Sequence, residues 1–201
     1  SFDPEGETAE AFETTGIRFT HIRRTALLEG LSEGLLVIGE GVSFEEYRSL
    51  AKTLSQLAAA GVPVLCLAPA GGVWDMPGAG DSEQPLPARV SLRREDVIRE
   101  LDKRLDSIAW PPDGRIVAGR MGIRSSRQGV VFQVLADGDP GSEAAWSWIE
   151  VCYPDNGSSL LYCGFAIVRQ WDAGPAPRFL LARIIERLAK QNPSESTQQE
   201  D

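Results

Sequence analysis

Apolar residues in the first half of the chain alternate between short continuous runs and a stripe at helical spacing. The runs GLLVIGEG at 34–41 and GVPVLCLAPAGG at 61–72 end in small residues, which is typical of buried parallel strands. Between them, an apolar stripe predicts a helix over 44–60, with Ser43 as N-cap and Glu46 completing a capping box. Strand, helix and strand with short connections form a βαβ unit, which predicts helices on both faces of a sheet.

The segments around this unit are shorter and less regular. Helix formers at 6–16 predict a helix, and the alternation at 17–22 predicts a strand. Glycine, proline and acidic residues dominate 69–90, which predicts a long loop, and Ser91 is expected to cap a helix over 94–108. Two further short strands are predicted at 114–123 and 128–136.

The C-terminal third carries the clearest pattern. Strands are predicted at 145–154 and 159–171, on either side of the Asp-Asn-Gly turn at 155–157, which together form a β-hairpin. A closing helix is predicted over 174–190, with proline in its first turn. The polar segment 191–201 has the composition of a disordered tail.

The length, the net charge and the lack of long apolar runs disfavour several classes of binding partner. The 201 residues suit one domain, and the net charge of −9 disfavours binding to nucleic acid or to anionic lipid. The sequence contains no apolar run of about 20 residues, so direct membrane insertion is not expected. The first residues resemble the inside of a domain, so we expect a piece cut from a longer protein. Its compartment stays open, and would be extracytoplasmic if that protein is secreted.

Cysteine and histidine are sparse. The three cysteines fit no zinc spacing and His21 is the single histidine, so neither a metal site nor another cofactor is expected. Cys66 lies inside an apolar run, which favours an inert buried thiol. Cys152 and Cys163 would face each other if the hairpin turn centred on 157–158, and would otherwise remain free thiols.

Four segments together resemble a class I glutamine amidotransferase-like domain, of the divergent, non-catalytic type appended to larger bacterial proteins: DPEGETAEAFETTGIRFTHI (3–22), LLVIGEGV (35–42), GVPVLCLAPAGG (61–72) and LLYCGFAIVRQWDAGPAPRFLLARIIERL (160–188). The resemblance implies a flavodoxin-like three-layer α/β/α sandwich over residues 1–190, with a mostly parallel central sheet. It also implies that the first strand precedes residue 1 or survives only in Ser1 and Phe2.

The resemblance also bears on catalysis. Its register places Ala68 where working members carry the nucleophilic cysteine, and no histidine follows His21, although the family's His-x-Glu pair comes late in the chain. We therefore expect no glutaminase chemistry and assign no catalytic residue. The chain is therefore expected to be a pseudoenzyme that acts by binding or interaction within a larger protein. The expected partners are the other domains of that protein, or a small polar ligand or carbohydrate.

Two alternatives stay open, and both use the same expected ligand cleft. One is a hydrolase that uses the carboxylates of Glu40 and Asp75 as acid and base. The other is a binder of a small anion or nucleotide at the turn 39–43. Trp74 could instead pack into the core and hold its loop in place. The arginines at 120, 124 and 127 could form a patch that binds an anion or a partner, or could belong to a solvated loop. The cleft is expected to be lined by Glu40, Gly41, Ala68, Gly71, Gly72, Trp74 and Asp75.

Overall fold

The fold was examined in a computed structural model of the chain. The structure describes residues 1–76, 84–92, 119–125, 133–136, 145–154 and 158–190. The predicted helix at 94–108, the hairpin turn at 155–157, Arg127 and the polar tail at 191–201 lie outside the described residues.

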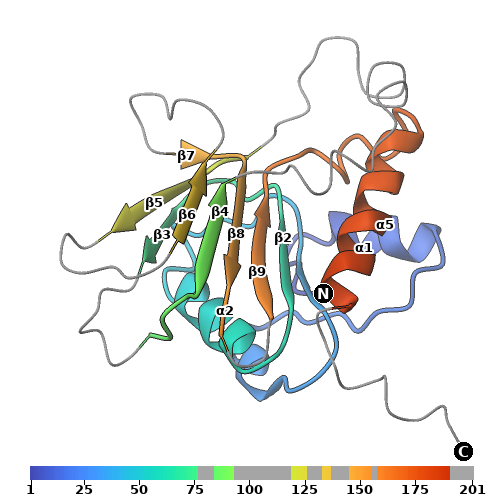
Figure 1. The fold of residues 1–201 in the computed structure, drawn as a ribbon. Helices are drawn as coiled ribbons and strands as arrows, with labels where there is room; N and C mark the ends of the chain where they lie inside the picture. Colours follow the sequence, from blue (N-terminus) through green and yellow to red (C-terminus); the bar gives the residue numbers. More distant parts are fainter. Residues whose placement is uncertain (77–83, 93–118, 126–132, 137–144, 155–157, 191–201) are drawn as a thin grey trace, which may run out of the picture.

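A mixed sheet of six strands forms the centre of the described part (Figure 1). Only β8 runs against the other five strands, so the sheet is mostly parallel. Its strands follow the order β1 (Leu36–Ile38), β2 (Val64–Leu67), β9 (Ser159–Cys163), β8 (Trp148–Cys152), β4 (Arg89–Leu92) and β6 (Gln133–Ala136). A smaller sheet holds β3 (Val73–Met76), β5 (Met121–Ser125) and β7 (Ala145–Trp146).

Helices contribute to two separate apolar clusters. The first cluster includes residues of α2 (Leu50–Ala59) and the 3-10 helix η1 (Thr25–Gly30), and the second includes residues of α1 (Glu7–Thr14) and α5 (Pro175–Ala189). In β1 the side chains of Leu36 and Ile38 belong to the first cluster, and that of Val37 to the second. Because successive strand residues point to opposite faces, the two clusters lie on opposite faces of an α/β sheet.

The predicted βαβ unit is present as β1, α2 and β2, and β1 pairs with β2 in parallel. The helix is shorter than predicted, because α2 begins at Leu50 and residues 44–49 form turns. The Oγ of Ser43 accepts the N–H of Glu46 at 3.3 Å, so the predicted cap organises a turn instead of a helix.

Three other local predictions were wrong. Residues 17–22 contain only a single bridge, at Ile22, instead of a strand. The predicted loop at 69–90 includes β3, which pairs with β5 in the smaller sheet. Ser91 lies inside β4, paired with Glu150, and therefore caps no helix. Each of these segments depends on a partner far away in the chain.

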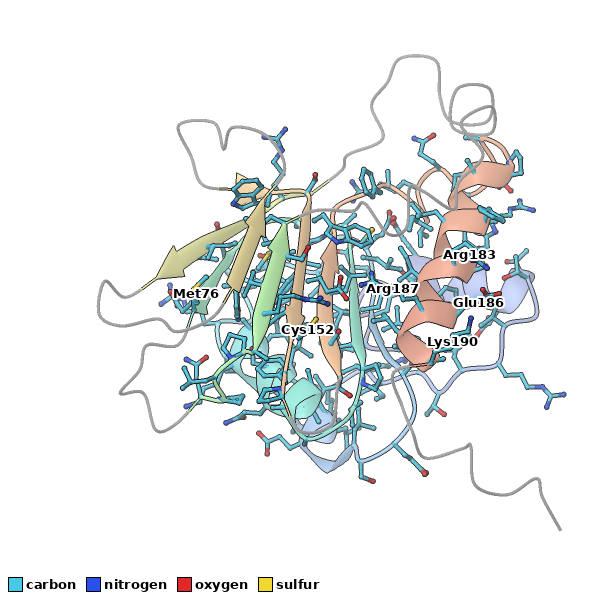
Figure 2. The ribbon with its side chains drawn as sticks, viewed as in Figure 1. Met76, Cys152, Arg183, Glu186, Arg187 and Lys190 are labelled. Carbon is cyan, nitrogen blue, oxygen red and sulfur yellow. The ribbon has the colours of Figure 1, made fainter. Side chains whose placement is uncertain are left out.

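The C-terminal hairpin and closing helix were confirmed, but the strand predicted at 145–154 is divided between β7 and β8 in different sheets, and the strand predicted at 159–171 ends at Cys163. Strands β8 and β9 form an antiparallel hairpin, and α5 begins at Pro175. The hairpin register pairs Cys152 with Ser159 and Cys163 with Trp148, so the two cysteines do not face each other, and all three cysteines are free. Arg187 of α5, which is labelled in Figure 2, forms an ion pair with Glu150 of β8, and this pair ties the helix to the sheet. Within the described residues, the helices are too short or too polar to cross a membrane.

Candidate functional site

Two turns meet where β1 and β2 end. The N–H of Gly41 donates to the carbonyl of Ala68 at 3.1 Å, and the N–H of Phe44 donates to the carbonyl of Gly71 at 3.2 Å. A third bond runs from the N–H of Ala70 to the carbonyl of Val42 at 3.1 Å. The structure therefore brings three of the predicted cleft residues together, at the edge of the sheet where open α/β folds bind ligands.

Ala68 at the tip of the second turn has a strained backbone. Its φ is 29°, and no other non-glycine residue in the described part of the chain has a positive φ. Its N–H donates to the carbonyl of Cys163 at 2.7 Å, and its side chain is 4% exposed. A sharp, strained turn after a buried strand is the geometry that presents the nucleophile in many hydrolases. Here that position carries a buried methyl group.

Glycines allow neighbouring backbones to close over this turn. A Cβ at Gly119 would lie 2.1 Å from the carbonyl oxygen of Pro69, and a Cβ at Gly164 would lie 2.2 Å from that of Gly119. On the other side, a Cβ at Gly72 would lie 2.4 Å from the Cβ of Phe44. Gly119 therefore packs directly against the main chain of Ala68 and Pro69, with no room for a side chain between them.

The backbone donors around the turns are largely used. Pro69, directly after Ala68, has no N–H, although an oxyanion hole at such a turn uses the N–H of that residue. In the first turn, the N–H groups of Gly39, Glu40 and Gly41 donate to the carbonyl of Phe2, the hydroxyl of Thr8 and the carbonyl of Ala68. These three groups are thus not available to an anion at the 39–43 turn.

Glu40 is a buried carboxylate, 2% exposed, that joins two loops. One of its oxygens accepts the N–H of Val168 at 2.6 Å, and the other accepts the N–H of Arg169 at 3.1 Å. Burial raises the pKa of Glu40 above its ordinary value, while these two N–H groups and the charge of Arg169 act in the opposite direction. The side chain fastens the loop after β9 to the loop after β1.

The remaining predicted cleft residues lie on β3. The indole of Trp74 is 1% exposed in the first apolar cluster, and its Nε1–H donates to the Oγ of Ser55 on α2 at 3.3 Å. Asp75 is exposed, as expected for alternating strand residues. Trp74 therefore packs in the first apolar cluster against α2 and holds β3 in place, and it presents no open face to a ligand.

Sequence reasoning missed the role of Asp3, which is 1% exposed. Its two carboxylate oxygens accept the N–H groups of Gly6 at 3.1 Å and Ala9 at 2.9 Å, at the start of α1. An aspartate shortly before a helical pattern is the signal that could have predicted this cap. His21 lies beside it, with its Nε2 at 2.8 Å from the carbonyl oxygen of Asp3.

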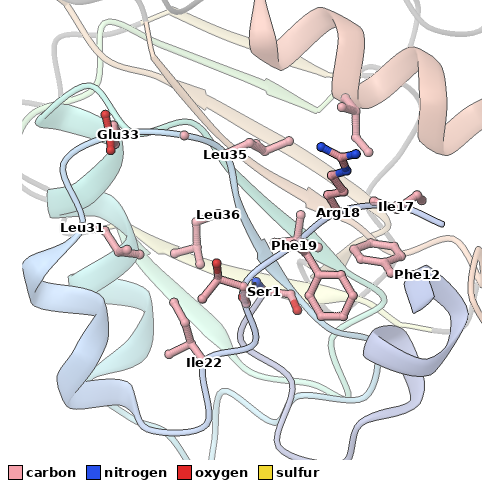
Figure 3. Close-up of a pocket in the computed structure, with 14 residues that line it drawn as sticks. Ser1, Phe12, Ile17, Arg18, Phe19, Ile22, Leu31, Glu33, Leu35 and Leu36 are labelled. Carbon is pink, nitrogen blue, oxygen red and sulfur yellow. Dashed lines mark hydrogen bonds between the residues drawn. The ribbon is translucent and has the colours of Figure 1, made fainter.

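The described residues line a groove and a pocket. A groove of about 430 Å³ separates α1 from residues 168–172, next to the loop that Glu40 holds. A pocket of about 410 Å³ lies beside β1, with Ser1 in its wall (Figure 3). Ala68 lines neither of them, so the strained turn opens into neither cavity.

The thiols differ in their surroundings. Burial raises the pKa of the Cys66 thiol well above its ordinary value, and Cys163 is fully buried. Cys152 is half-buried, with its Sγ 3.3 Å from Nη2 of Arg89 and 3.4 Å from Oγ of Ser159. Among the residues that the structure describes, no group of three or more histidine, cysteine or acidic side chains is placed to hold a metal.

Comparison of the chain with protein-family models, with curated proteins and with solved structures finds no match in any of the three.

Proposed function

We propose that this chain is a non-catalytic module of the class I glutamine amidotransferase-like type, arranged as a three-layer α/β/α sandwich. It works by binding or interaction within a larger bacterial protein, and its partners are other domains of that protein. The two apolar clusters on opposite faces of the sheet support the three-layer arrangement.

The turn at Ala68 carries this proposal. Its φ of 29° preserves a nucleophile elbow, while the residue at its tip has no nucleophilic atom and the next residue, Pro69, has no N–H. The backbone of Gly119 packs directly against Ala68 and Pro69. Backbone strain of this kind is concentrated at active sites. A strained turn without a reactive side chain is therefore what we expect of a fold that has lost its catalytic residue.

The test is a search for glutamine hydrolysis by the purified protein, with ammonia release as the readout. We expect no turnover above the rate without protein. The Ala68→Cys variant should also stay inactive, because Pro69 offers no oxyanion donor and no histidine follows the turn in the chain. Measurable glutamine turnover by the unmodified protein would overturn the proposal.

The two alternative functions receive less support from the same geometry. Both oxygens of Glu40 accept backbone N–H groups, which suits a structural clamp better than an acid or base. Three N–H groups of the 39–43 turn are bonded within the protein, so an anion there would meet few donors. A thermal-shift screen with nucleotides and sugar phosphates checks the second alternative, since a tight ligand must raise the melting temperature.

A further inference from the structure

The two walls of the groove between α1 and residues 168–172 are joined by a single residue. The N–H of Glu40 donates to the Oγ1 of Thr8 on α1 at 3.0 Å, and the carboxylate of Glu40 accepts the N–H groups of Val168 and Arg169. Thr8 and Glu40 are both buried. Glu40 therefore fixes the separation of the two walls, and the groove of about 430 Å³ has the size of a site for a small molecule.

The two walls carry opposite charges. Glu7 and Glu10 lie three residues apart on α1, so they share one side of the helix, and both line the groove. Arg169 lines the other wall, and its Nη2 lies 3.5 Å from the position that a Cβ at Gly41 would take. The guanidinium is therefore at the end of β1, at the edge of the sheet where open α/β folds bind ligands. The Oε2 of Glu5 lies 4.0 Å from the same position.

No ion pair crosses the groove within the described residues. The side chains of Glu7, Glu10 and Arg169 form no ion pair with each other or with any other described residue, and Glu5 forms none with Arg169. Opposite charges thus face each other across the groove without meeting. A ligand that carries both signs of charge can bridge them.

Trp171 adds an apolar surface in a fixed orientation. Its indole lines the groove, is 9% exposed and packs in the second apolar cluster. The guanidinium of Arg178 lies 5.5 Å from the centre of the ring, and its Nε–H donates to the carbonyl of Trp171 at 3.0 Å. Arg178 also pairs with Asp172 at 2.6 Å, so these two charges neutralise each other. The groove therefore offers apolar contact beside its unpaired charges.

The balance of the unpaired charges indicates the class of ligand. Two carboxylates and one guanidinium are complemented by a molecule with two ammonium groups and one carboxylate. Basic amino acids have this composition, and their methylene chain suits an aromatic surface. A ligand with a net positive charge is also favoured by the net charge of −9 of the chain.

We propose that the groove between α1 and residues 168–172 binds a free basic amino acid. The carboxylate of the ligand pairs with Arg169, its two ammonium groups pair with Glu7 and Glu10, and its methylene chain lies against Trp171. The inference goes beyond the interaction role proposed above, because it adds a small-molecule ligand to a module whose proposed partners are protein domains.

The experiment titrates the whole chain with L-lysine by isothermal titration calorimetry, with the melting temperature as a second readout. Cadaverine lacks the carboxylate of lysine, and L-norleucine lacks its side-chain ammonium group, so the two compounds are matched controls. We expect saturable binding of lysine, a melting temperature that rises with its concentration, and at least about tenfold weaker binding of either control.

The order of the probes separates a site from general attraction to an acidic protein. Attraction to the net charge of −9 alone favours cadaverine over lysine, because cadaverine has two positive charges and no negative one. Binding of cadaverine as tight as that of lysine would therefore overturn the proposal, as would the absence of saturable lysine binding up to about 10 mM.

Variants locate the site. Arg169→Gln removes the positive charge, and the double variant Glu7→Gln/Glu10→Gln removes the two negative ones. Each should weaken lysine binding at least about tenfold, and the melting temperature without ligand shows that each variant is folded. Arg23→Gln and Glu13→Gln are the matched controls, since both residues are exposed and lie outside the groove. Lysine binding that persists unchanged in either groove variant would overturn the proposal.

The two proposals of this article fail separately. Absence of lysine binding leaves the absence of glutamine hydrolysis and the interaction role untouched. Glutamine hydrolysis would overturn the non-catalytic role without bearing on the groove.

Discussion

The closest backbone approach at the candidate site is that of Gly119 to the turn at Ala68 and Pro69. A Cβ at position 119 would lie 2.1 Å from the carbonyl oxygen of Pro69, and main chain cannot yield as the end of a flexible side chain can. We expect Gly119→Ala to lower the free energy of unfolding by about 3 kcal/mol or more, measured by urea titration. The matched control is Gly30→Ala, since a Cβ at Gly30 meets no atom within 4 Å.

An equal and small effect of the two alanine substitutions on the free energy of unfolding would contradict this packing.

The strained φ of Ala68 gives the site a second residue-scale feature, because a left-handed conformation suits glycine better than alanine. Neither feature could be predicted from the sequence: a glycine in a loop and an alanine after a strand have many other uses. The proximity of Gly41, Ala68 and Gly71 could be predicted, because parallel neighbouring strands end at the same edge of a sheet.

The three thiols should differ in reactivity with a maleimide at pH 8. Cys152 is half-buried beside the guanidinium of Arg89, whereas Cys66 and Cys163 are fully buried, and burial raises the pKa of Cys66. We expect the native protein to be labelled at Cys152 first, and the other two positions to react only after unfolding in urea. Peptide mapping by mass spectrometry checks the order, and native labelling of Cys66 as fast as Cys152 would contradict it.

At the scale of elements, Glu40 fastens the loop after β1 to the loop after β9, and its titration should be visible in stability. A carboxyl whose pKa is higher in the folded than in the unfolded protein binds its proton more tightly when folded. The protein therefore loses stability as the pH rises from about 4.3, the unfolded value, through the raised folded pKa. Above that range the loss is complete and constant.

The Glu40→Gln variant cannot titrate at this position. We expect the free energy of unfolding of the variant, minus that of the parent, to grow across that pH window and then level off. Urea titrations between about pH 3.5 and pH 8 measure the difference. Glu29→Gln, at an exposed position on η1, is the control. A difference that stays constant with pH would show that the Glu40 carboxyl is not perturbed by folding.

The helices and strands that could be predicted are those that are determined by residues close to them in the sequence. The βαβ unit, the β8–β9 hairpin and α5 follow from periodicity and turn residues within a few positions, and the sequence predicts all three. The start of α2 was misplaced, because Ser43 can accept the N–H of Glu46 in a turn as well as in a helix. β3 was missed because its partner β5 begins at Met121, so nothing close to Val73 in the sequence indicates the pairing.

At the scale of the whole molecule, one sheet separates two cores, and the described helices are divided between them. Leu54 of α2 is fully buried in the first cluster, and Ile184 of α5 is 1% exposed in the second. Each alanine substitution should lower the free energy of unfolding by about 2 to 5 kcal/mol, because each leaves a cavity that the surroundings fill only in part.

Because the two cores share one sheet, we make a further prediction for the double variant Leu54→Ala/Ile184→Ala. Because the two side chains have no common cluster, their effects should add within about 0.5 kcal/mol. Because both cores are built on the same strands, loss of either should unfold the sheet, so tryptophan fluorescence and far-ultraviolet circular dichroism should report one coincident transition in urea. Two separated transitions in any of the three variants would mean that the faces of the sheet unfold independently.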